Sequence, residues 1–589
     1  MVRRVFGILC IVVLLASAVG YAATTGRMKG KVSDNDGLAL PGVTVQISSV
    51  NLIGGPQVAI SGIDGGFTFN MLPIGMYTVS VSLSGFSPAT GEVRVQLDRL
   101  ATVEFLLVPE QFGGEIEVLA EVPIVDTAQV NTQQVFDQDF LQNAAIGASG
   151  RDYLSIIGQV AGVAGDANAS VFGGMQTDNA FLIDGLNTTD PVTGTFGTNF
   201  NYDAIQEVSF QTGGFEAEFG QATGGIINLV TKSGGNEFSG SFDVRFRDQS
   251  FIESGEHFDP DEEVSSFRDV SATLGGPILR DKLWFFVSGE DVKTEIRWEG
   301  THFPRVYEGQ NYIAKTTWQM ADSHRAVFKY STDPAEIPGA NMSQFVLESA
   351  KYTQKQGGDI WQAEFNSVLS ESVLLNAKLG IVRGLIEGGP SSNPDTWSTH
   401  WNEDTGISSH NYGSTFADDR DRDEFGMHLS WFLDDFAGSH EFKFGVEYND
   451  LYFGSVNYPN GGAWIDDVEE EINYADLNGD GYFNHLVTIK EPEEDARNKE
   501  NSYGDITTFF VQDSWRPMAN LTVKPGLRFD NIGLSNHVGD DIADMDRWQP
   551  RFGVAWDIGG NARYVLRASW GRFMDPTALS IPSFASGIP

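Results

Sequence analysis

The sequence is poor in basic residues, in cysteine and in long apolar runs. Its 589 residues include 38 lysines and arginines against 80 aspartates and glutamates, a net charge of −42. This charge excludes the basic surface that nucleic-acid binding requires. Beyond the N-terminal segment no stretch approaches 18 apolar residues, which excludes helical membrane spans. The GxxxxGK[ST] and HExxH patterns are also missing, so we expect neither a nucleotide site nor an enzyme.

The N-terminus has the three-part pattern of a secretory signal, which we predict at residues 1–22. Two arginines are followed by an apolar run from Val5 to Ala16 and then by small residues. The run is short for a spanning helix, although a retained membrane anchor is the alternative. Cys10, the only cysteine, lies in this run. Cleavage would therefore leave a mature chain without disulfides or a catalytic thiol.

Residues 27–108 are predicted to form a small β-sandwich. Short alternating segments, such as Val43–Ile47, are separated by turns that contain glycine, such as Asp36-Gly37 and Asp64-Gly65-Gly66. Strands and turns at this spacing are typical of a sandwich of two antiparallel sheets.

Residues 109–130 are interpreted as a linker with one short extended stretch. That stretch consists of Glu115, Ile116, Glu117, Val118 and Leu119. An exposed strand of this kind can add to the sheet edge of a partner protein. It can equally be an ordinary edge strand of a neighbouring domain, and these five residues alone leave both readings open.

Residues 131–235 are predicted to form a compact domain of mixed α/β character. Short helices are expected at Phe136–Asn143 and Gly150–Val160, and strands are expected from Asn179 onward. The last of these strands, Ile226–Val230, runs into a turn at Lys232–Asn236.

Residues 236–589 are predicted to form an array of antiparallel strands, each with one apolar and one charged face. In Ser241–Arg247 phenylalanine and valine alternate with aspartate and arginine, and the same period of two recurs to the end of the chain. Trp361 and Trp431 fall on apolar strand faces, where we expect them to form part of lipid-facing aromatic girdles.

Short and long links alternate along this array. The short links are predicted at 275–282, 320–323, 369–372, 435–439, 516–520 and 558–561, and the long polar links at 249–264, 333–358, 385–421, 451–502 and 533–546. Short turns at one end and long loops at the other are typical of a transmembrane β-barrel. Because backbone groups in lipid must be paired internally, such strands are expected to close into a barrel, with residues 131–235 inside.

Several motifs in order resemble the plug domain of TonB-dependent outer-membrane receptors. They are Gly150-Arg151-Asp152-Tyr153-Leu154, Leu182-Ile183-Asp184-Gly185-Leu186 and the run from Gly224 to Gly234. Upstream, Leu40–Val45, Asp64–Phe67 and Leu72–Tyr77 resemble the carboxypeptidase regulatory-like domain, which implies a noncatalytic module. Together they resemble the Oar-like subgroup of these receptors. The fold class expected is therefore mainly β: an N-terminal β-sandwich, an α/β plug domain and a transmembrane antiparallel β-barrel.

The resemblance implies an outer-membrane receptor of a Gram-negative-type bacterium, in contact with outer-membrane lipid. It would bind an extracellular solute, namely a carbohydrate, a peptide or a siderophore. A TonB-type, periplasm-spanning energy transducer would pull on Glu115–Leu119, so that the plug rearranges and the solute enters the periplasm. A non-transporting protein for adhesion, export or structure is the alternative. We count roughly 13 strands where receptors of the resembled family have about 22, so the chain is interpreted as the N-terminal part of a barrel.

The longest link carries a candidate calcium loop. Asp476, Asn478 and Asp480 stand at alternate positions before a glycine, and Tyr482 would add its backbone carbonyl. This is the first half of an oxygen-ligand loop for Ca²⁺. Val487 occupies the twelfth position, where an acidic ligand is expected. A solvated acidic turn is the alternative.

Other long-loop residues are weaker candidates. Trp401 and Trp464 could stack on a sugar or peptide ligand, although packing within the loops is the commoner role for such residues. His400 and His410 with Asp404 have loose metal-ligand spacing.

Overall fold

The computed structural model describes residues 25–585, apart from a set of short stretches. These are 50–51, 53–54, 97–99, 111–115, 118–128, 145–153, 166–167, 249, 251–263, 371, 392, 394–396, 403–404, 434–435, 461–463, 469–485, 491–497, 519, 537–538, 561–562 and 575–578. The predicted signal at 1–22, with Cys10, lies outside the described residues. Within the described part, no helix combines the length and the apolar character needed to cross a membrane.

The N-terminal unit is a sandwich of two sheets, with strand orders β4-β1-β7 and β3-β2-β5-β6-β8. Its strands are β1 Thr25–Asp34, β2 Thr44–Ser48, β3 Gln57–Ile60, β4 Gly66–Pro73, β5 Gly75–Ser82, β6 Ala89–Val95, β7 Leu100–Leu107 and β8 Ile116–Glu117. Alternate residues of facing strands, such as Val45, Val79 and Phe105, are buried between the sheets. The period of two seen in the sequence therefore places every second side chain in one core.

The plug is built around a five-stranded sheet in the order β13-β12-β15-β14-β9. Its elements are β9 Thr132–Asp137, α2 Gln138–Asn143, α3 Leu154–Ile157, β10 Val163–Ala164, β11 Ser170–Val171, η2 Gln176–Asp178, β12 Ala180–Ile183, β13 Leu186–Asn187, η3 Tyr202–Ala204, β14 Ile205–Thr212 and β15 Gly225–Thr231. All seven residues of β15 are buried, because this central strand is covered on both faces.

The helices predicted in the plug are only partly correct. Phe136 lies in strand β9, where it pairs with Val208 and is buried, so the helix begins at Gln138 instead. Asp137 caps this helix by accepting a hydrogen bond from the Phe140 N–H. Of the second predicted helix, 150–160, the described residues are helical at Leu154–Ile157 and not beyond, and residues 150–153 lie outside the described part. Burial of Phe136 against the neighbouring strand thus outweighs the local helical pattern.

The wall is one antiparallel sheet whose main path has thirteen strands, which agrees with the predicted number. In path order they are β16 Ser239–Arg247, β17 Val264–Leu279, β18 Leu283–Arg297, β19 Arg305–Ala321, β20 His324–Thr332, β22 Tyr352–Ser370, β23 Val373–Pro390, β26 Ser414–Leu433, β27 His440–Pro459, β30 Asn498–Asp513, β32 Leu521–Ser535, β33 Asp541–Asp557 and β34 Val565–Gly571. No ladder joins β16 to β34 in the described residues. The presence of further wall strands stays a prediction.

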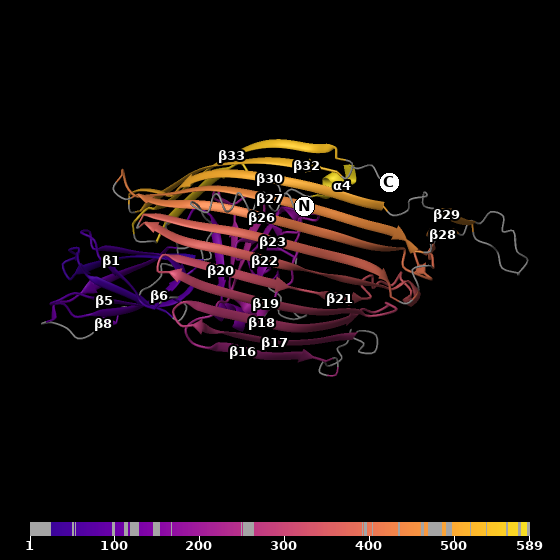
Figure 1. The fold of residues 1–589 in the computed structure, drawn as a ribbon, viewed down its shortest axis with the longest axis horizontal. Helices are drawn as coiled ribbons and strands as arrows, with labels where there is room; N and C mark the ends of the chain where they lie inside the picture. Colours follow the sequence, from indigo (N-terminus) through magenta and orange to yellow (C-terminus); the bar gives the residue numbers. More distant parts are fainter. Residues whose placement is uncertain are drawn as a thin grey trace, which may run out of the picture.

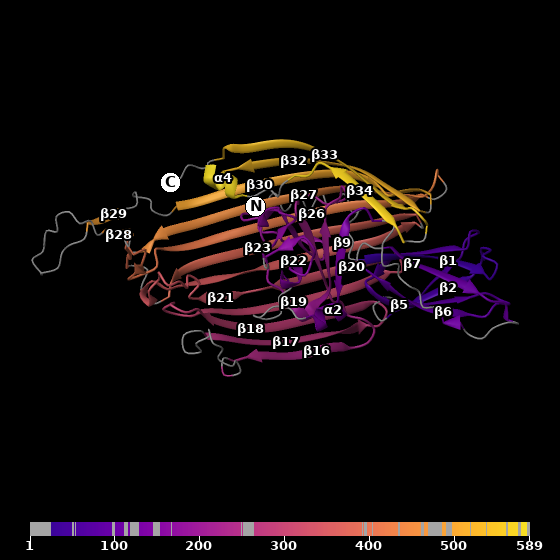
Figure 2. The ribbon, with the colours of Figure 1, turned by 180° about the vertical axis from the view of Figure 1, so that it is seen from behind.

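Shorter elements lie beside this path. They are β21 Ala335–Pro338 and β31 Trp515–Met518 on the wall, β24 Thr399–Asn402, β25 Ser408–Ser409, β28 Trp464–Val468 and β29 Leu486–Lys490 in a separate small sheet, the turn η5 Glu348–Ala350, and α4 Ser580–Ala585. Figures 1 and 2 show the sandwich beyond one end of the wall and strands β28 and β29 beyond the other. The plug lies within the curved sheet in both views.

The predicted short turns are found, and the bounds of β16 and β17 agree with the predicted link at 249–264, but the other four long links are shorter than expected. β32 continues to Ser535 and β33 begins at Asp541, so the predicted link at 533–546 is wrong at both ends. Likewise β23 runs to Pro390 and β27 to Pro459. These extensions carry apolar as well as polar side chains, and Leu451, Phe453 and Leu534 are buried together in a separate apolar cluster.

The two faces of the wall differ as predicted. Phe242 and Phe246 on β16 are 74% and 65% exposed, whereas Arg528 and Asp530 on β32 are buried. Trp361 and Trp431 also lie on the exposed face. Apolar side chains thus point away from the plug, and charged side chains point toward it.

Candidate functional site: the contact between plug and wall

The plug packs against the inner face of the wall through a mixed apolar and polar contact. Wall residues Phe286, Ile313 and Ile360 join the apolar core of the plug. Around this apolar contact, acidic groups and backbone carbonyls of the plug meet basic side chains of the wall. These polar contacts form two clusters, one around Asp184 and one around Glu216 and Glu218.

Asp184 of the Leu182–Leu186 motif is the centre of the first cluster. It follows β12 with φ of 49°, and Gly185 follows with φ of 73°, so the chain turns sharply here. The Asp184 carboxylate is 2.8 Å from Lys329 Nζ and 3.8 Å from Lys315 Nζ. It also accepts hydrogen bonds from the backbone and hydroxyl of Thr231.

The charge of Asp184 is maintained by these partners. Burial raises the pKa of this carboxyl, but the ammonium groups of Lys315 and Lys329 outweigh burial and lower the pKa to about 2. The buried Asp184 carboxylate thus lies between two buried ammonium groups, and the buried Glu364 adds a second negative charge near Lys329.

Two further wall bases extend this cluster along the plug. Lys378 Nζ donates to the backbone carbonyl of Gly185 and lies 2.8 Å from Glu424. Arg420 is 2.8 Å from Asp190 of the plug. The lumen-facing residues of β23 and β26 thus contact the plug segment that follows the motif.

The second cluster is formed by the plug loop Gly213–Gly220. Glu216 accepts a hydrogen bond from Lys524 at 2.5 Å, and Glu218 accepts one from Lys443 at 2.7 Å. Gln512 donates to both carboxylates at 2.9 Å. Three wall strands, β27, β30 and β32, thereby hold one short loop.

Arg528 completes this second cluster. Its side chain is 1% exposed, and it pairs with Asp530 and Glu447 while donating to the backbone carbonyl of Glu218 at 3.0 Å. A Cβ atom at Gly220 would lie 2.3 Å from the guanidinium carbon, so only glycine allows this approach.

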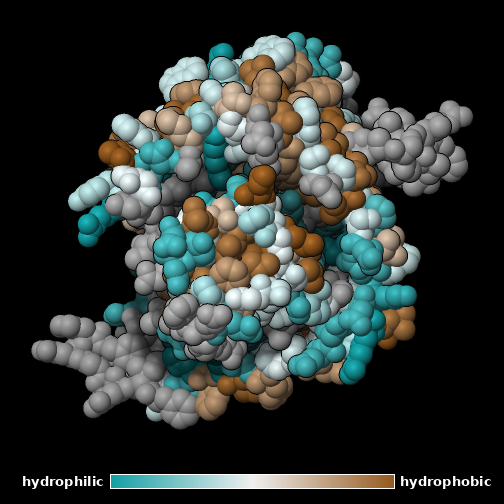
Figure 3. All heavy atoms as spheres, turned by 90° about the vertical axis from the view of Figure 1, so that its left-hand side faces the viewer, coloured by the Kyte–Doolittle hydropathy of each residue, from teal (hydrophilic) through white to brown (hydrophobic). Residues whose placement is uncertain are grey.

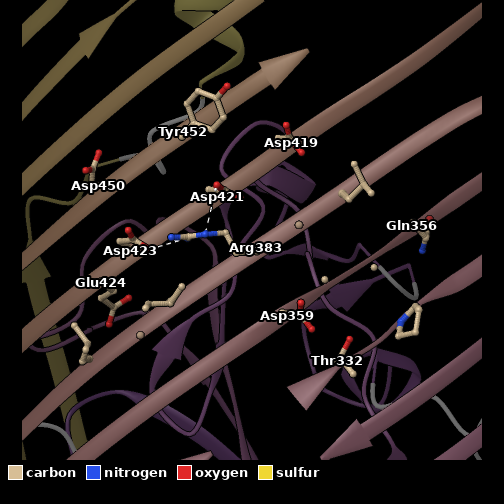
Figure 4. Close-up of a pocket in the computed structure, with 18 of the residues that line it drawn as sticks. Thr332, Gln356, Asp359, Arg383, Asp419, Asp421, Asp423, Glu424, Asp450 and Tyr452 are labelled. Atoms are coloured by element: carbon tan, nitrogen blue, oxygen red, sulfur yellow. Dashed lines mark ion pairs between the residues drawn. The ribbon is translucent and has the colours of Figure 1, made fainter. Parts of the chain in front are cut away.

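The outer face of the wall carries a different cluster, in a hollow of about 2260 Å³. Arg383 lies 2.7 Å from Asp423 and 3.5 Å from Asp421, and Figure 4 shows Asp419 and Asp450 near these groups. These residues alternate with plug-contacting ones such as Arg420 and Glu424, so they point away from the lumen.

Such charges are costly in hydrocarbon, so this part of β23, β26 and β27 extends beyond the apolar band of the wall. The outer hollow is therefore separate from the contact between plug and wall.

The predicted coupling segment lies at the edge of the sandwich. Ile116 and Glu117 form β8, which pairs in parallel with Ala89 and Thr90 of β6. Glu115, Val118 and Leu119 lie outside the described residues. The structure thus shows the edge-strand arrangement for two of the five residues, and the role in coupling stays a prediction.

The candidate calcium ligands Asp476, Asn478, Asp480 and Tyr482 also lie outside the described residues. Across the described ranges, no group of three or more histidine, cysteine, aspartate or glutamate side chains is arranged to hold a metal ion.

The loop residues are only partly placed. The His400 and His410 rings stack with centroids 3.9 Å apart, Trp401 is exposed, and Asp404 lies outside the described residues. Trp464 begins β28. No common site for these residues is formed by their described atoms.

Sequence reasoning did not select Asp184, Glu216 or Glu218 as functional residues. One signal was available, since Asp184 lies within a motif that was noted for its resemblance. The lysines that oppose these acids lie on four different strands, β19, β20, β27 and β32, and only the barrel register brings them to the plug.

Comparison with known proteins agrees with this architecture. A family model described as TonB dependent receptor-like, beta-barrel matches residues 313–587, and the carboxypeptidase regulatory-like domain model matches residues 27–108. The TonB-dependent transporter Oar of Myxococcus xanthus is 23% identical over an alignment that covers 98% of this chain and 64% of that protein. Residues 313–587 thus match the β-barrel domain of TonB-dependent receptors.

Solved receptor structures share the fold. The outer-membrane transporter YddB from Escherichia coli superposes with a TM-score of 0.59 at 17% identity, over 76% of this chain and 62% of that one. The ferric enterobactin receptor PfeA from Pseudomonas aeruginosa, in complex with enterobactin, gives 0.53 at 15%, over 77% and 64%. This chain therefore spans less than two thirds of the length of each of these relatives.

These matches confirm three predictions. TonB-dependent receptors are outer-membrane β-barrel proteins of Gram-negative bacteria, so the predicted location and the mainly β fold are confirmed. These receptors are not enzymes. The family model that matches residues 27–108 is that of a carboxypeptidase regulatory-like domain.

Proposed function

We propose that this receptor binds an extracellular solute and imports it into the periplasm when an energy transducer of the TonB type pulls on residues 115–119. The observation that carries the proposal is the position of β9. This strand is the first element of the plug after the linker, and it is also the edge strand of the plug sheet. A pull on the linker would therefore act first on the plug strand that is easiest to remove.

The pairing of β9 supports sequential removal. Six residue pairs join β9 to β14, and β14 is its only sheet partner among the described strands. Polar side chains reinforce this pairing: Asn131 donates to Gln211 at 2.8 Å, and Gln133 donates to Ser209 at 2.7 Å. An edge strand pulled from its end loses one pair at a time, so no step breaks the whole ladder.

The polar contact between plug and wall supports reversible rearrangement. Ion pairs and hydrogen bonds exchange with water when the interface opens, and they form again when it closes. An apolar interface of the same extent would expose its surface to water at a cost of roughly 25 cal/mol per Å². The clusters around Asp184 and Glu218 suit a plug that moves within a fixed wall.

The solute is a carbohydrate, a peptide or a siderophore in this proposal. Loop composition does not encode the ligand, and PfeA with its enterobactin shares only the fold with this chain. Growth of a deletion strain on defined carbon, iron and peptide sources would identify the class of solute.

Deletion of residues 115–119 tests coupling once that growth condition is known. We expect loss of solute-dependent growth while whole cells still bind the solute, because the binding surface remains but the pull is lost. Deletion of residues 123–127 is the matched control, since it shortens the linker equally and leaves the segment intact. Unchanged growth in the 115–119 deletion would instead favour the non-transporting adhesion, export or structural role.

We also propose that Asp476, Asn478, Asp480 and Tyr482 bind Ca²⁺ in an extracellular loop. Their oxygen atoms recur at the spacing that lets a loop wrap a hard cation. Calorimetric titration of the full chain with Ca²⁺ should show binding that Asp476→Asn with Asp480→Asn weakens at least tenfold. The paired change Asp466→Asn with Asp467→Asn serves as the control, and equal weakening by both pairs would leave only a diffuse acidic surface.

A further inference from the structure

A small polar cavity lies where the plug, the wall and the sandwich meet. Its volume is about 140 Å³, room for four or five waters at about 30 Å³ each. The plug lines it with Gln129, Asn131, Gln211 and the loop residues Glu216 and Glu218. The cavity thus reaches the second of the two clusters that hold the plug in place.

The wall side of the cavity is also rich in hydrogen-bonding groups. Asn366, Asn376, Ser430 and Gln512 line it. The Asn376 Oδ1 atom is shielded from solvent and has no hydrogen-bond partner in the described part of the chain. An unsatisfied amide oxygen at a polar cavity indicates that a hydrogen-bond donor, from water or a passing molecule, belongs there.

The plug side of the cavity is the side that a pull would move. Gln129 and Asn131 lie just before β9, ten and twelve residues after Leu119. Their hydrogen bonds to Gln133 and Gln211 tie them to β9 and β14. Removal of β9 would therefore take away one wall of the cavity and enlarge it.

The sandwich covers the end of the cavity that faces the short turns. Arg27 of β1 lines the cavity and lies 2.5 Å from Glu441 of β27, with its guanidinium 5.7 Å from the centre of the Phe432 ring. Figure 3, which looks onto this end, shows the sandwich standing across the opening of the wall.

Two further contacts fix the sandwich to the plug. Arg94 pairs with Asp137 at 2.7 Å and with Asp139 at 3.0 Å. Ile74, in the turn between β4 and β5, packs with Val230 of β15 in a small buried cluster. The sandwich is therefore attached to both the wall and the plug, and it lines the cavity with Gly26 and Arg27.

We propose that this cavity is the start of the exit path to the periplasm and that the sandwich is its gate, held closed by the pair Arg27–Glu441. The proposal rests on the import function proposed above and adds the route and its closing element. The lining combines amides and a hydroxyl with balanced acids and bases, so the path suits an uncharged solute rich in hydroxyl or amide groups. A sugar or a peptide backbone has this chemistry.

The gate is tested by the accessibility of a cysteine placed in the cavity. The parent protein in this test is the purified full chain with Cys10→Ser and Asn376→Cys, and the probe is a small, charged, membrane-impermeant thiol reagent. We expect slow labelling in this parent and labelling at least tenfold faster after Arg27→Glu, which places two acids face to face. The double change Arg27→Glu with Glu441→Arg should restore the slow rate, because the ion pair forms again with its charges exchanged.

Asp322→Cys, on an exposed turn of the wall, is the matched control and should label equally fast in all backgrounds. Ser430→Cys is a second reporter in the same cavity, in case Asn376→Cys does not fold. Equal labelling rates in the parent and in Arg27→Glu would contradict the proposed gate. A fast labelling rate in the double variant Arg27→Glu with Glu441→Arg would contradict it as well.

Because labelling needs no solute or transducer, its result is independent of the deletion of residues 115–119. Failure of the gate and failure of the import proposal are thus separate outcomes.

Discussion

At the scale of single residues, the polarity of the contact between plug and wall is its main feature. The plug supplies Asp184, Asp190, Glu216 and Glu218, and the wall supplies lysines and arginines that oppose them. Buried charges of this kind are costly to separate from their partners, so each one helps to hold the plug in its position within the wall. The same charges can be solvated once the interface opens, which distinguishes them from an apolar seal.

Asp184→Asn should loosen the plug. The change keeps the shape of the side chain but removes the carboxylate that pairs with the buried Lys315 and Lys329, at a cost of about 3 kcal/mol. Hydrogen exchange at the amides of β12 and β15 should therefore become faster by roughly two orders of magnitude. Asp139→Asn, at a plug residue whose side chain is 78% exposed, is the control and should change exchange little. Equal rates in both variants would show that Asp184 does not hold the plug.

Asp333 should make the stability of the contact between plug and wall depend on pH. It joins Asn199 of the plug to Gly358 of the wall by accepting their backbone N–H groups at 2.7 and 2.9 Å. Burial raises the pKa of Asp333 from 3.8 to about 7, although these hydrogen bonds oppose the rise.

The folded state therefore binds this proton more tightly than the unfolded state. The stabilisation is full below pH 4 and is lost as the pH rises through 7, by roughly 2 kcal/mol between pH 5 and pH 8. Thermal unfolding at both pH values should show this loss in the parent and a smaller loss in Asp333→Asn. A stability that rises toward pH 8 in the parent would contradict the prediction.

At the scale of secondary-structure elements, the period of two determines which strand face meets lipid. The wall strands alternate between outward side chains, many of them apolar and exposed, and inward side chains that include buried charges such as Arg528 and Asp530. The alternation was readable because it is local, and it predicted the number of wall strands. It did not predict where the strands end, because backbone pairing continues into segments that were interpreted as long links.

Phe509→Arg should measure the apolar band directly. Phe509 is 53% exposed on β30 and pairs with Val446, between the outward residues Phe444 and Tyr448. Arginine near the middle of the hydrocarbon should lower the free energy of unfolding in lipid vesicles by about 2 to 4 kcal/mol. Asp419→Arg, on the charged extension of β26, should cost little. A similar loss in both variants would place the lipid boundary elsewhere.

At the scale of the whole molecule, three units lie along one axis, with the plug inside the wall and the sandwich across one end (Figure 1). Their contacts differ in burial. The plug is held by buried pairs such as Lys329–Asp184, whereas the sandwich is held by partly exposed pairs such as Arg27–Glu441 and Arg94–Asp137. Exposed pairs contribute about 0 to 1 kcal/mol each and weaken with salt, so the sandwich is the unit that moves most easily.

Salt should therefore separate the two attachments. At an ionic strength near 1 M, where charges are screened within about 3 Å, hydrogen exchange should become faster at Pro73–Tyr77 of the sandwich. The amides of β15 in the plug should keep their protection, because their ion pairs are buried. Mass spectrometry of the full chain in detergent at low and high salt measures both regions together. Loss of plug protection before sandwich protection would reverse the proposed order of release.

The sequence by itself determined the strand faces, the short turns and the compact unit that precedes the wall, because each depends on neighbours close in the chain. Only the tertiary structure decided that Asp184 meets Lys315 and Lys329, and that Arg27 reaches Glu441, 414 positions away. Such contacts depend on the curvature of the sheet and on the position of the plug within it. Both are set by the packing of the whole chain. The helix expected at Phe136 failed for the same reason, since burial against β14 outweighed its local pattern.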